Sequence, residues 1–187
     1  MRPLSSLLAV ALMATAGAAF AQPMPQIGGQ ASHIEALDFM KGEWRGTATI
    51  YSQTGPQTLT QTERVGTMLQ GDILVVEGHG YDADGETEFN AMGIVSWNPA
   101  TAAYDFRSYA MGFSGTYPFN ATENGFAWEI PAGPNAKIVY NAVIEGDDWH
   151  ETGHYVRDGM APVKTIEMTL KRIGDTDWPA ANPVSLD

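Results

Sequence analysis

The 187-residue chain contains no cysteine, which excludes disulfide bonds, thiolate metal sites and a lipid-modified cysteine. Basic residues are scarce, because 10 Lys and Arg stand against 22 Asp and Glu, and the formal net charge is −12. Nucleic acids and anionic membranes bind clustered basic side chains, so we expect neither as a partner. No apolar run is long enough to cross a bilayer comfortably as a helix, so we expect no membrane span.

The N-terminal segment has the three parts of a secretory signal. Arg2 supplies the positive charge, residues 7–16 are apolar, and a small-x-small pattern ends at Ala21. We therefore expect residues 1–21 to be cleaved as a signal peptide, and the mature protein to be periplasmic or secreted. Residues 22–31 are rich in Pro and Gly and predict a flexible leader.

One short helix is expected at the start of the folded domain. Ser32 can cap this helix, Glu35 completes a capping box, and Gly42 ends it. The apolar residues Ile34 and Leu37 would face the body of the protein. No other helix-length pattern follows, so no parallel crossover connections are expected.

From Trp44 onward the sequence is typical of a pleated sheet. Turn signals separate about ten short runs rich in β-branched and aromatic residues, a pattern that predicts hairpins and an antiparallel meander. Closing such a sheet removes both edge strands. The predicted fold is therefore all-β: a single antiparallel up-and-down barrel of about ten strands with one short N-terminal helix, over residues 32–173. Prolines in residues 174–187 predict an irregular C-terminal tail.

Strand alternation places one tryptophan and one arginine at the same end of the barrel. Trp44 begins the more apolar, inward face of the first strand, and Arg172 ends the inward face of the last strand. These two strands are neighbours in a closed meander, so the two side chains should meet there. A guanidinium over an indole is worth about 0.5–2 kcal/mol. We expect this pair to close the barrel structurally.

The sequence "GEW" and the later "LKR" resemble the calycin superfamily of lipocalin-like and fatty-acid-binding-like barrels. The longer stretches "LDFMKGEWRGTATI" and "ETGHYVRDGMAPVKTIEMTLKR" are similar to a bacterial lipocalin-like family of domains of unknown function. This resemblance extends from Leu37 to Ile173. It implies a ligand-holding barrel in which the Trp–Arg pair is a structural lock.

The haem-binding nitrobindin barrels open with a similar Gly-x-Trp-x-Gly-x-Gly pattern, so haem is an alternative. In this chain Ala48 replaces the last glycine. The resemblance also implies an axial histidine near the final strand, but residues 163–173 contain none. His150 and His154 lie one strand earlier. We therefore predict no cofactor, and haem stays open as an alternative.

The same two histidines could suggest a metal site. In a strand, His150 and His154 would share one face but lie about 13 Å apart at about 3.3 Å per residue. That distance is too large for one zinc ion, whose ligands lie about 2 Å from the metal. The segment 79–88 is rich in acidic residues and superficially resembles a calcium-binding loop. A hairpin turn at Asp84-Gly85 explains this segment without a metal. We expect no bound metal.

Aromatic side chains are plentiful, and small barrels often hold one ligand. We predict that the barrel binds a small apolar or amphipathic molecule, without catalysis. The predicted wall of the ligand site comprises Tyr104, Phe106, Trp128, Tyr140, His150 and His154.

Two other functions stay open. A cavity-based isomerase or hydrolase would use Glu151, Tyr155 or a histidine as acid and base. A filled barrel would act as an interaction module, with no cavity and with an exposed apolar patch on its outer wall.

Overall fold

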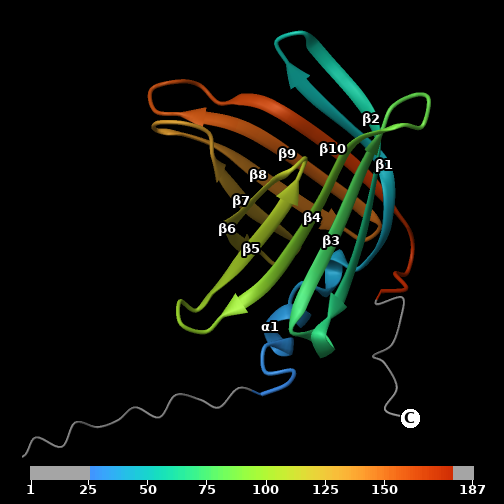
Figure 1. Ribbon diagram of the computed structural model, residues 1–187, viewed down its shortest axis with the longest axis vertical. Helices are drawn as coiled ribbons and strands as arrows, with labels where there is room; N and C mark the ends of the chain where they lie inside the picture. The colour runs from blue at the N-terminus through green and yellow to red at the C-terminus, as the bar shows by residue number, and fades with distance from the viewer. Residues whose placement is uncertain (1–25, 179–187) are drawn as a thin grey trace, which may run out of the picture.

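The computed structural model describes residues 26–178, which form one closed barrel of antiparallel strands (Figure 1). Each strand pairs with the next along the chain, and the first strand pairs with the tenth. This architecture confirms the predicted all-β barrel with one short helix. The predicted signal peptide, residues 1–21, lies outside the described residues, as do residues 22–25 and 179–187.

The elements follow one another along the chain in a simple order. They are α1 Ala31–Glu35, the 3-10 turn η1 Asp38–Met40, β1 Gly42–Ser52, β2 Gly55–Met68, the 3-10 turn η2 Leu69–Gly71, β3 Ile73–Tyr81, β4 Thr87–Asn98, β5 Ala103–Ala110, β6 Phe113–Ala121, β7 Gly125–Pro131, β8 Ala136–Glu145, β9 Asp148–Arg157 and β10 Val163–Gly174.

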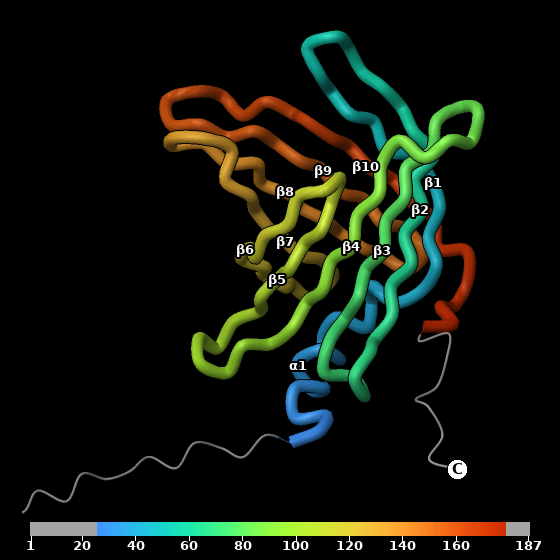
Figure 2. The backbone as a smooth tube through the Cα atoms, viewed as in Figure 1, coloured from blue at the N-terminus to red at the C-terminus, as the bar shows by residue number. Residues whose placement is uncertain are grey.

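The two ends of the barrel differ. The helical segments α1 and η1 lie at the end where β1 begins, which we call the plugged end (Figure 2). There Ile34, Leu37 and Met40 are fully buried together with Trp44. The opposite end is formed by the β1–β2, β3–β4, β5–β6, β7–β8 and β9–β10 turns, and we call it the hairpin end.

The start of α1 corrects the predicted cap. The helix begins at Ala31 and its N-cap is Gln30, which makes no side-chain capping bond, so the assignment of that role to Ser32 is wrong. Instead, the carboxylate of Asp72 beside η2 accepts hydrogen bonds from the backbone N–H groups of Gly28 and Gln30, at 3.0 and 2.8 Å. The last residues of the expected leader are thus tied to the barrel.

β1 and β10 close the barrel in a ladder that places Trp44 opposite Arg172 and Ile50 opposite Ile166. Gly46 makes this approach possible, because a Cβ atom there would collide with the backbone carbonyl oxygen of Thr169. The atoms that this Cβ would meet belong to the backbone of β10, so no flexible side chain could move to relieve the collision. A glycine is therefore required at this point of the seam.

Trp44 and Arg172 both hold η1 against the seam. The indole N–H of Trp44 donates to the carbonyl of Met40 at 2.9 Å, and Nε of Arg172 donates to the carbonyl of Lys41 at 3.3 Å. The predicted stacking of guanidinium on indole does not form. Within residues 26–178 the cation–π contacts are Arg64 with Trp178 and Lys164 with Tyr51.

The ladder between β6 and β7 is short. It pairs Phe119, Asn120 and Ala121 with Trp128, Ala127 and Phe126, all toward the plugged end. By contrast, β5 pairs with β6 from Tyr104 to Ala110. The hairpin-end halves of β6 and β7 are therefore not joined by ladder pairs.

We predict that Gly46→Ala destabilises the protein by about 1–3 kcal/mol, because the added methyl forces β1 and β10 apart. Urea unfolding followed by tryptophan fluorescence measures the loss. Gly174→Ala, on the β10 side of the same seam and with open space around the added Cβ, is the matched control and should change stability little. Equal effects of the two substitutions would contradict the role assigned to Gly46.

Candidate functional site

The barrel holds an inner cavity of about 560 Å³ that is partly open to its surroundings. Its lining comes from β1 to β10, with Met40 of η1 at the plugged end. Most of the wall is apolar, because strand alternation points one face of every strand inward. The barrel is thus not filled completely by its own side chains.

Three of the predicted wall residues form one aromatic surface inside this cavity. Trp128 of β7 lies flat against Tyr140 of β8, with ring centroids 4.0 Å apart and planes 6° from parallel. Phe106 of β5 meets Trp128 edge-on at 4.9 Å. Rigid aromatic anchors of this kind are typical of ligand pockets.

Tyr104 lies nearer the plugged end and is not among the residues that line the cavity. Its hydroxyl donates a hydrogen bond of 2.7 Å to the carbonyl of His33 in α1. Its ring meets Phe119 edge-on at 6.0 Å. Tyr104 therefore fastens the helix to the barrel.

The structure corrects the placement of His150 and His154, which lie on the outer face of β9. The His150 side chain is 52% exposed and its Nδ1 lies 3.1 Å from the hydroxyl of Thr169. Trp149 is only 2% exposed, so its side chain faces the barrel interior. Alternate residues of a strand share a face, so Glu151 also faces inward and His150 and His154 face outward. Tyr155 is half-buried and does not line the cavity.

Two glutamates carry carboxyl groups into the cavity, Glu63 from β2 and Glu151 from β9. The indole N–H of Trp128 donates to Oε1 of Glu151 at 3.3 Å, and that of Trp149 donates to Oε2 at 3.2 Å. The buried amide of Gln61 donates to Oε1 of Glu63 at 2.7 Å. Both carboxyl groups are thus oriented by neutral donors.

Gly78 of β3 makes space for the Glu63 side chain. A Cβ atom at this position would lie 2.7 and 2.8 Å from the two carboxyl oxygens of Glu63. The register places Gly78 directly opposite Glu63 across the β2–β3 ladder. The absence of a side chain here allows the carboxyl group to lie across the strand inside the cavity.

Burial raises the pKa of both cavity carboxyl groups. The pKa of Glu63 rises to about 8, because burial outweighs the hydrogen bond from Gln61 and the charges of Glu151 and Glu77 add to the rise. The pKa of Glu151 rises to about 7, because burial outweighs its two indole hydrogen bonds. Burial, and then the charge of Glu151, raises the pKa of Tyr140 to about 12.

The cavity offers these carboxyl groups no basic partner. Among the described residues that line it there is no Lys, Arg or His. Near pH 7 Glu63 is therefore mostly protonated, and Glu151 is close to half ionised. The pair can hydrogen-bond to a ligand, pair with a cation or exchange protons.

Haem does not fit this set of residues in the way the nitrobindin resemblance implies. That resemblance calls for an axial histidine, and none of the chain's four histidines lines the cavity. Within residues 26–178 there is also no cluster of three or more side chains suited to hold a metal ion.

Glu63 was not identified as a candidate from the sequence, although a signal was present. It shares its strand face with Leu59 and Val65, which are 3% and 0% exposed. A carboxyl group on the apolar face of a strand indicates a buried acid. Glu151 was named only as part of the enzyme alternative. Both faces of its strand carry polar residues, so the sequence did not show which face points into the barrel.

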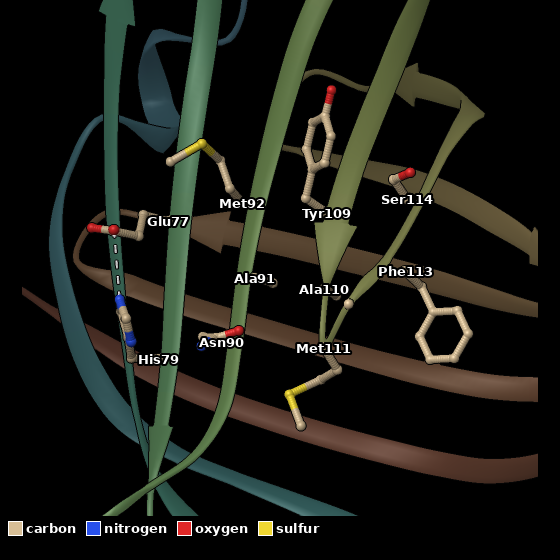
Figure 3. Close-up of a pocket in the computed structure, with 11 residues that line it drawn as sticks. Glu77, His79, Asn90, Ala91, Met92, Tyr109, Ala110, Met111, Phe113 and Ser114 are labelled. Atoms are coloured by element: carbon tan, nitrogen blue, oxygen red, sulfur yellow. Dashed lines mark ion pairs between the residues drawn. The ribbon is translucent and has the colours of Figure 1, made fainter.

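An outer groove of about 450 Å³ lies at the hairpin end, across β3 to β6 (Figure 3). Glu77 and His79 line one side of it, with an Oε1–Nε2 distance of 3.6 Å. Met111 and Phe113, at the β5–β6 turn, are 56% and 80% exposed. These two residues also line the inner cavity, so groove and cavity meet at this rim.

Comparison with known proteins identifies the fold but no family. No protein-family model matches the sequence, and no protein of curated function matches it. The chain is similar to the crystal structure of Rv2717c from M. tuberculosis, with a TM-score of 0.58 and 14% sequence identity, over 77% of this chain and 99% of that chain. At this identity the similarity supports the barrel architecture alone. Separately, none of the helices among the described residues is long and apolar enough to cross a membrane.

We predict that Glu63→Gln stabilises the protein at pH 9 by on the order of 2–4 kcal/mol and has little effect at pH 5. The folded pKa of about 8 exceeds the ordinary glutamate pKa of 4.5, so the folded state binds more protons than the unfolded state between these values. Stability contributed by protonated Glu63 is therefore lost as pH rises through this window, and glutamine cannot ionise.

Urea unfolding at several pH values between 5 and 9 measures this effect. Glu88→Gln, at an exposed position of β4, is the control and should show no such pH-dependent gain. A Glu63→Gln effect of equal size at pH 5 and pH 9 would contradict a buried, mostly protonated Glu63.

Proposed function

We propose that this protein binds one small, largely apolar molecule inside its barrel. The observation that carries the proposal is the cavity of about 560 Å³ with a mostly apolar wall and a few inward polar groups. Ligand pockets commonly measure about 300–1,000 Å³ and have this composition. The wall offers the rings of Phe106, Trp128 and Tyr140 for contact with the ligand.

The cavity also argues against a filled barrel that acts only as an interaction module. Side chains around a void lack contact partners on one side, so an apolar molecule of matching size restores dispersion contacts. The exposed apolar residues at the rim, Met111 and Phe113, border the cavity and supply an apolar path for such a ligand.

As part of this proposal, the chain is a calycin-type barrel that acts after export to the periplasm or outside the cell. The signal-like N-terminus supports export, and the Trp44–Arg172 seam supports the calycin assignment. The net charge of −12 supports a small-molecule ligand rather than a nucleic acid.

We predict that a neutral apolar dye, N-phenyl-1-naphthylamine, binds the protein in one-to-one stoichiometry. Ser108→Trp should weaken this binding at least about tenfold, because Ser108 lines the cavity and a large ring there occupies the ligand's space. Dye fluorescence titration measures the affinity. Arg107→Trp adds the same ring at the neighbouring exposed position and should leave the affinity unchanged. Absence of dye binding, or equal loss in both variants, would contradict a ligand site inside the barrel.

A second candidate function is proton-transfer catalysis in the same cavity, as in an isomerase or hydrolase. The observation that favours it is a pair of cavity carboxyl groups with pKa values of about 8 and about 7, matched to an acid and a base near neutral pH. The sequence suggested Glu151 for this role; Glu63, which lines the same cavity, would be its partner in place of Tyr155 or a histidine.

For this second candidate, we predict that a molecule co-purified with the native protein changes mass or isomeric form on incubation. Glu151→Gln should stop the change while the molecule still binds, because glutamine keeps the shape but cannot exchange the proton. Chromatography with mass detection follows the reaction. A bound molecule that stays unaltered in the wild-type protein would leave binding alone as the function.

A further inference from the structure

The carboxyl groups of Glu63 and Glu151 lie in an apolar cavity without a counter-charge. A buried carboxylate is costly unless it is paired, and structural buried acids usually have a basic partner. Among the described residues lining the cavity, none is Lys, Arg or His. The fold therefore retains two acids at a position where packing alone would favour apolar side chains.

The nearest bases along the strand are used elsewhere. Arg64, the residue after Glu63, points to the outer face and pairs with Glu43 at 3.1 Å and with Asp177 at 3.4 Å. On β9, His150 likewise lies on the outer face, 3.9 Å from Glu167. Arg64 and His150 thus lie beside outer acids, and neither lines the cavity with the inner pair.

Both inner carboxyl groups keep capacity for a ligand. Within residues 26–178 the structure records a hydrogen bond to Oε1 of Glu63 from Gln61, and none to its Oε2. Each oxygen of Glu151 accepts a single indole N–H, and a carboxylate oxygen can accept two hydrogen bonds. These free acceptor positions match a donor such as a protonated amine.

The neighbouring rings suit a cation as well. Trp128 and Tyr140 lie flat against each other beside Glu151, and Trp149 donates to the same carboxylate. The faces of Trp and Tyr rings attract ammonium groups, and more strongly where water is excluded. The formal net charge of −12 favours the approach of a cation over that of an anion.

We propose that the ligand is an apolar molecule with a protonated amine or other organic cation at one end, which lies between Glu63 and Glu151 while the apolar part contacts the aromatic wall. This inference rests on the proposed function, the binding of a small molecule in the barrel. It adds the chemical class of the ligand.

Binding of a cation should depend on pH. The groups that act on Glu63 are Gln61 on its own strand, Glu77 on β3 and Glu151 on β9, and those that act on Glu151 are the two indoles. None of them is a base, so at pH 6 both carboxyl groups hold protons that a bound cation must displace. The affinity for a cation should therefore rise from pH 6 to pH 9, with release of protons.

The test compares three probes of equal chain length below their aggregation concentrations: decylammonium, 1-decanol and decanoate. Each displaces N-phenyl-1-naphthylamine from the full protein at pH 8.5. We expect decylammonium to bind at least about tenfold more tightly than decanol, and decanoate most weakly. Calorimetry at pH 6.5, where both carboxyl groups are mostly protonated, in two buffers of different ionisation enthalpy should show proton release with decylammonium and none with decanol.

The Glu63→Gln/Glu151→Gln variant should lose the preference for decylammonium but still bind decanol. Glu88→Gln, at an exposed position, should keep the preference. If the double variant does not fold, the single Glu151→Gln variant and the pH dependence of the wild-type protein decide.

Equal affinities for decylammonium and decanol, or tightest binding of decanoate, would overturn the cation inference and leave the proposed ligand cavity standing. Failure of the dye and all three probes to bind would overturn both.

Discussion

The closure of β1 onto β10 is the constraint on which the rest of the structure depends. An open sheet of this length would expose two edges and could not surround a cavity. Gly46 lets the two backbones approach, and the ladder from Trp44 to Ile50 continues without a gap along β10. Trp44 and Arg172 then use their polar atoms to hold η1 across the plugged end. One end is sealed by the same residues that complete the sheet.

The barrel, plugged at one end, sets the chemistry of its interior. Glu63 and Glu151 are half-buried on the cavity wall, and burial raises the pKa of both carboxyl groups into the neutral range. Their neighbours are neutral donors, which orient the carboxyl groups without supplying a positive charge. Gly78 provides the space in which the Glu63 carboxyl group lies. The interior is therefore a mostly apolar cavity with two carboxyl groups held in fixed orientations on its wall.

Much of the barrel could be predicted from the sequence because turns and alternation are local signals. The strand from Trp44 to Ile50 and the strand from Ile166 to Arg172 each have one clearly apolar face, so their parity could be determined. In β9 both faces carry polar residues, so the sequence does not show which face is inward. His150 and His154 were predicted to face the cavity, but they lie on the outer face of the barrel. Only the burial of Trp149 against other strands decides that parity.

The cavity itself could not be predicted in this way. Its size depends on which side chains from distant strands meet, and on small residues such as Gly78 opposite Glu63. In β2 Glu63 shares its face with Leu59 and Val65 but also with Gln61, so the pattern indicates a buried acid without showing what surrounds it. Its role emerges only when Gln61 and Glu151 are seen in the same enclosed space.

The short ladder between β6 and β7 gives the closed barrel a local pair of strand edges. Backbone N–H and C=O groups left without a neighbouring strand are a template on which another chain can add. Proline has no N–H to donate, and the two strands carry Pro118 and Pro131 in their unjoined halves. A proline in such a half offers no N–H donor to an added strand.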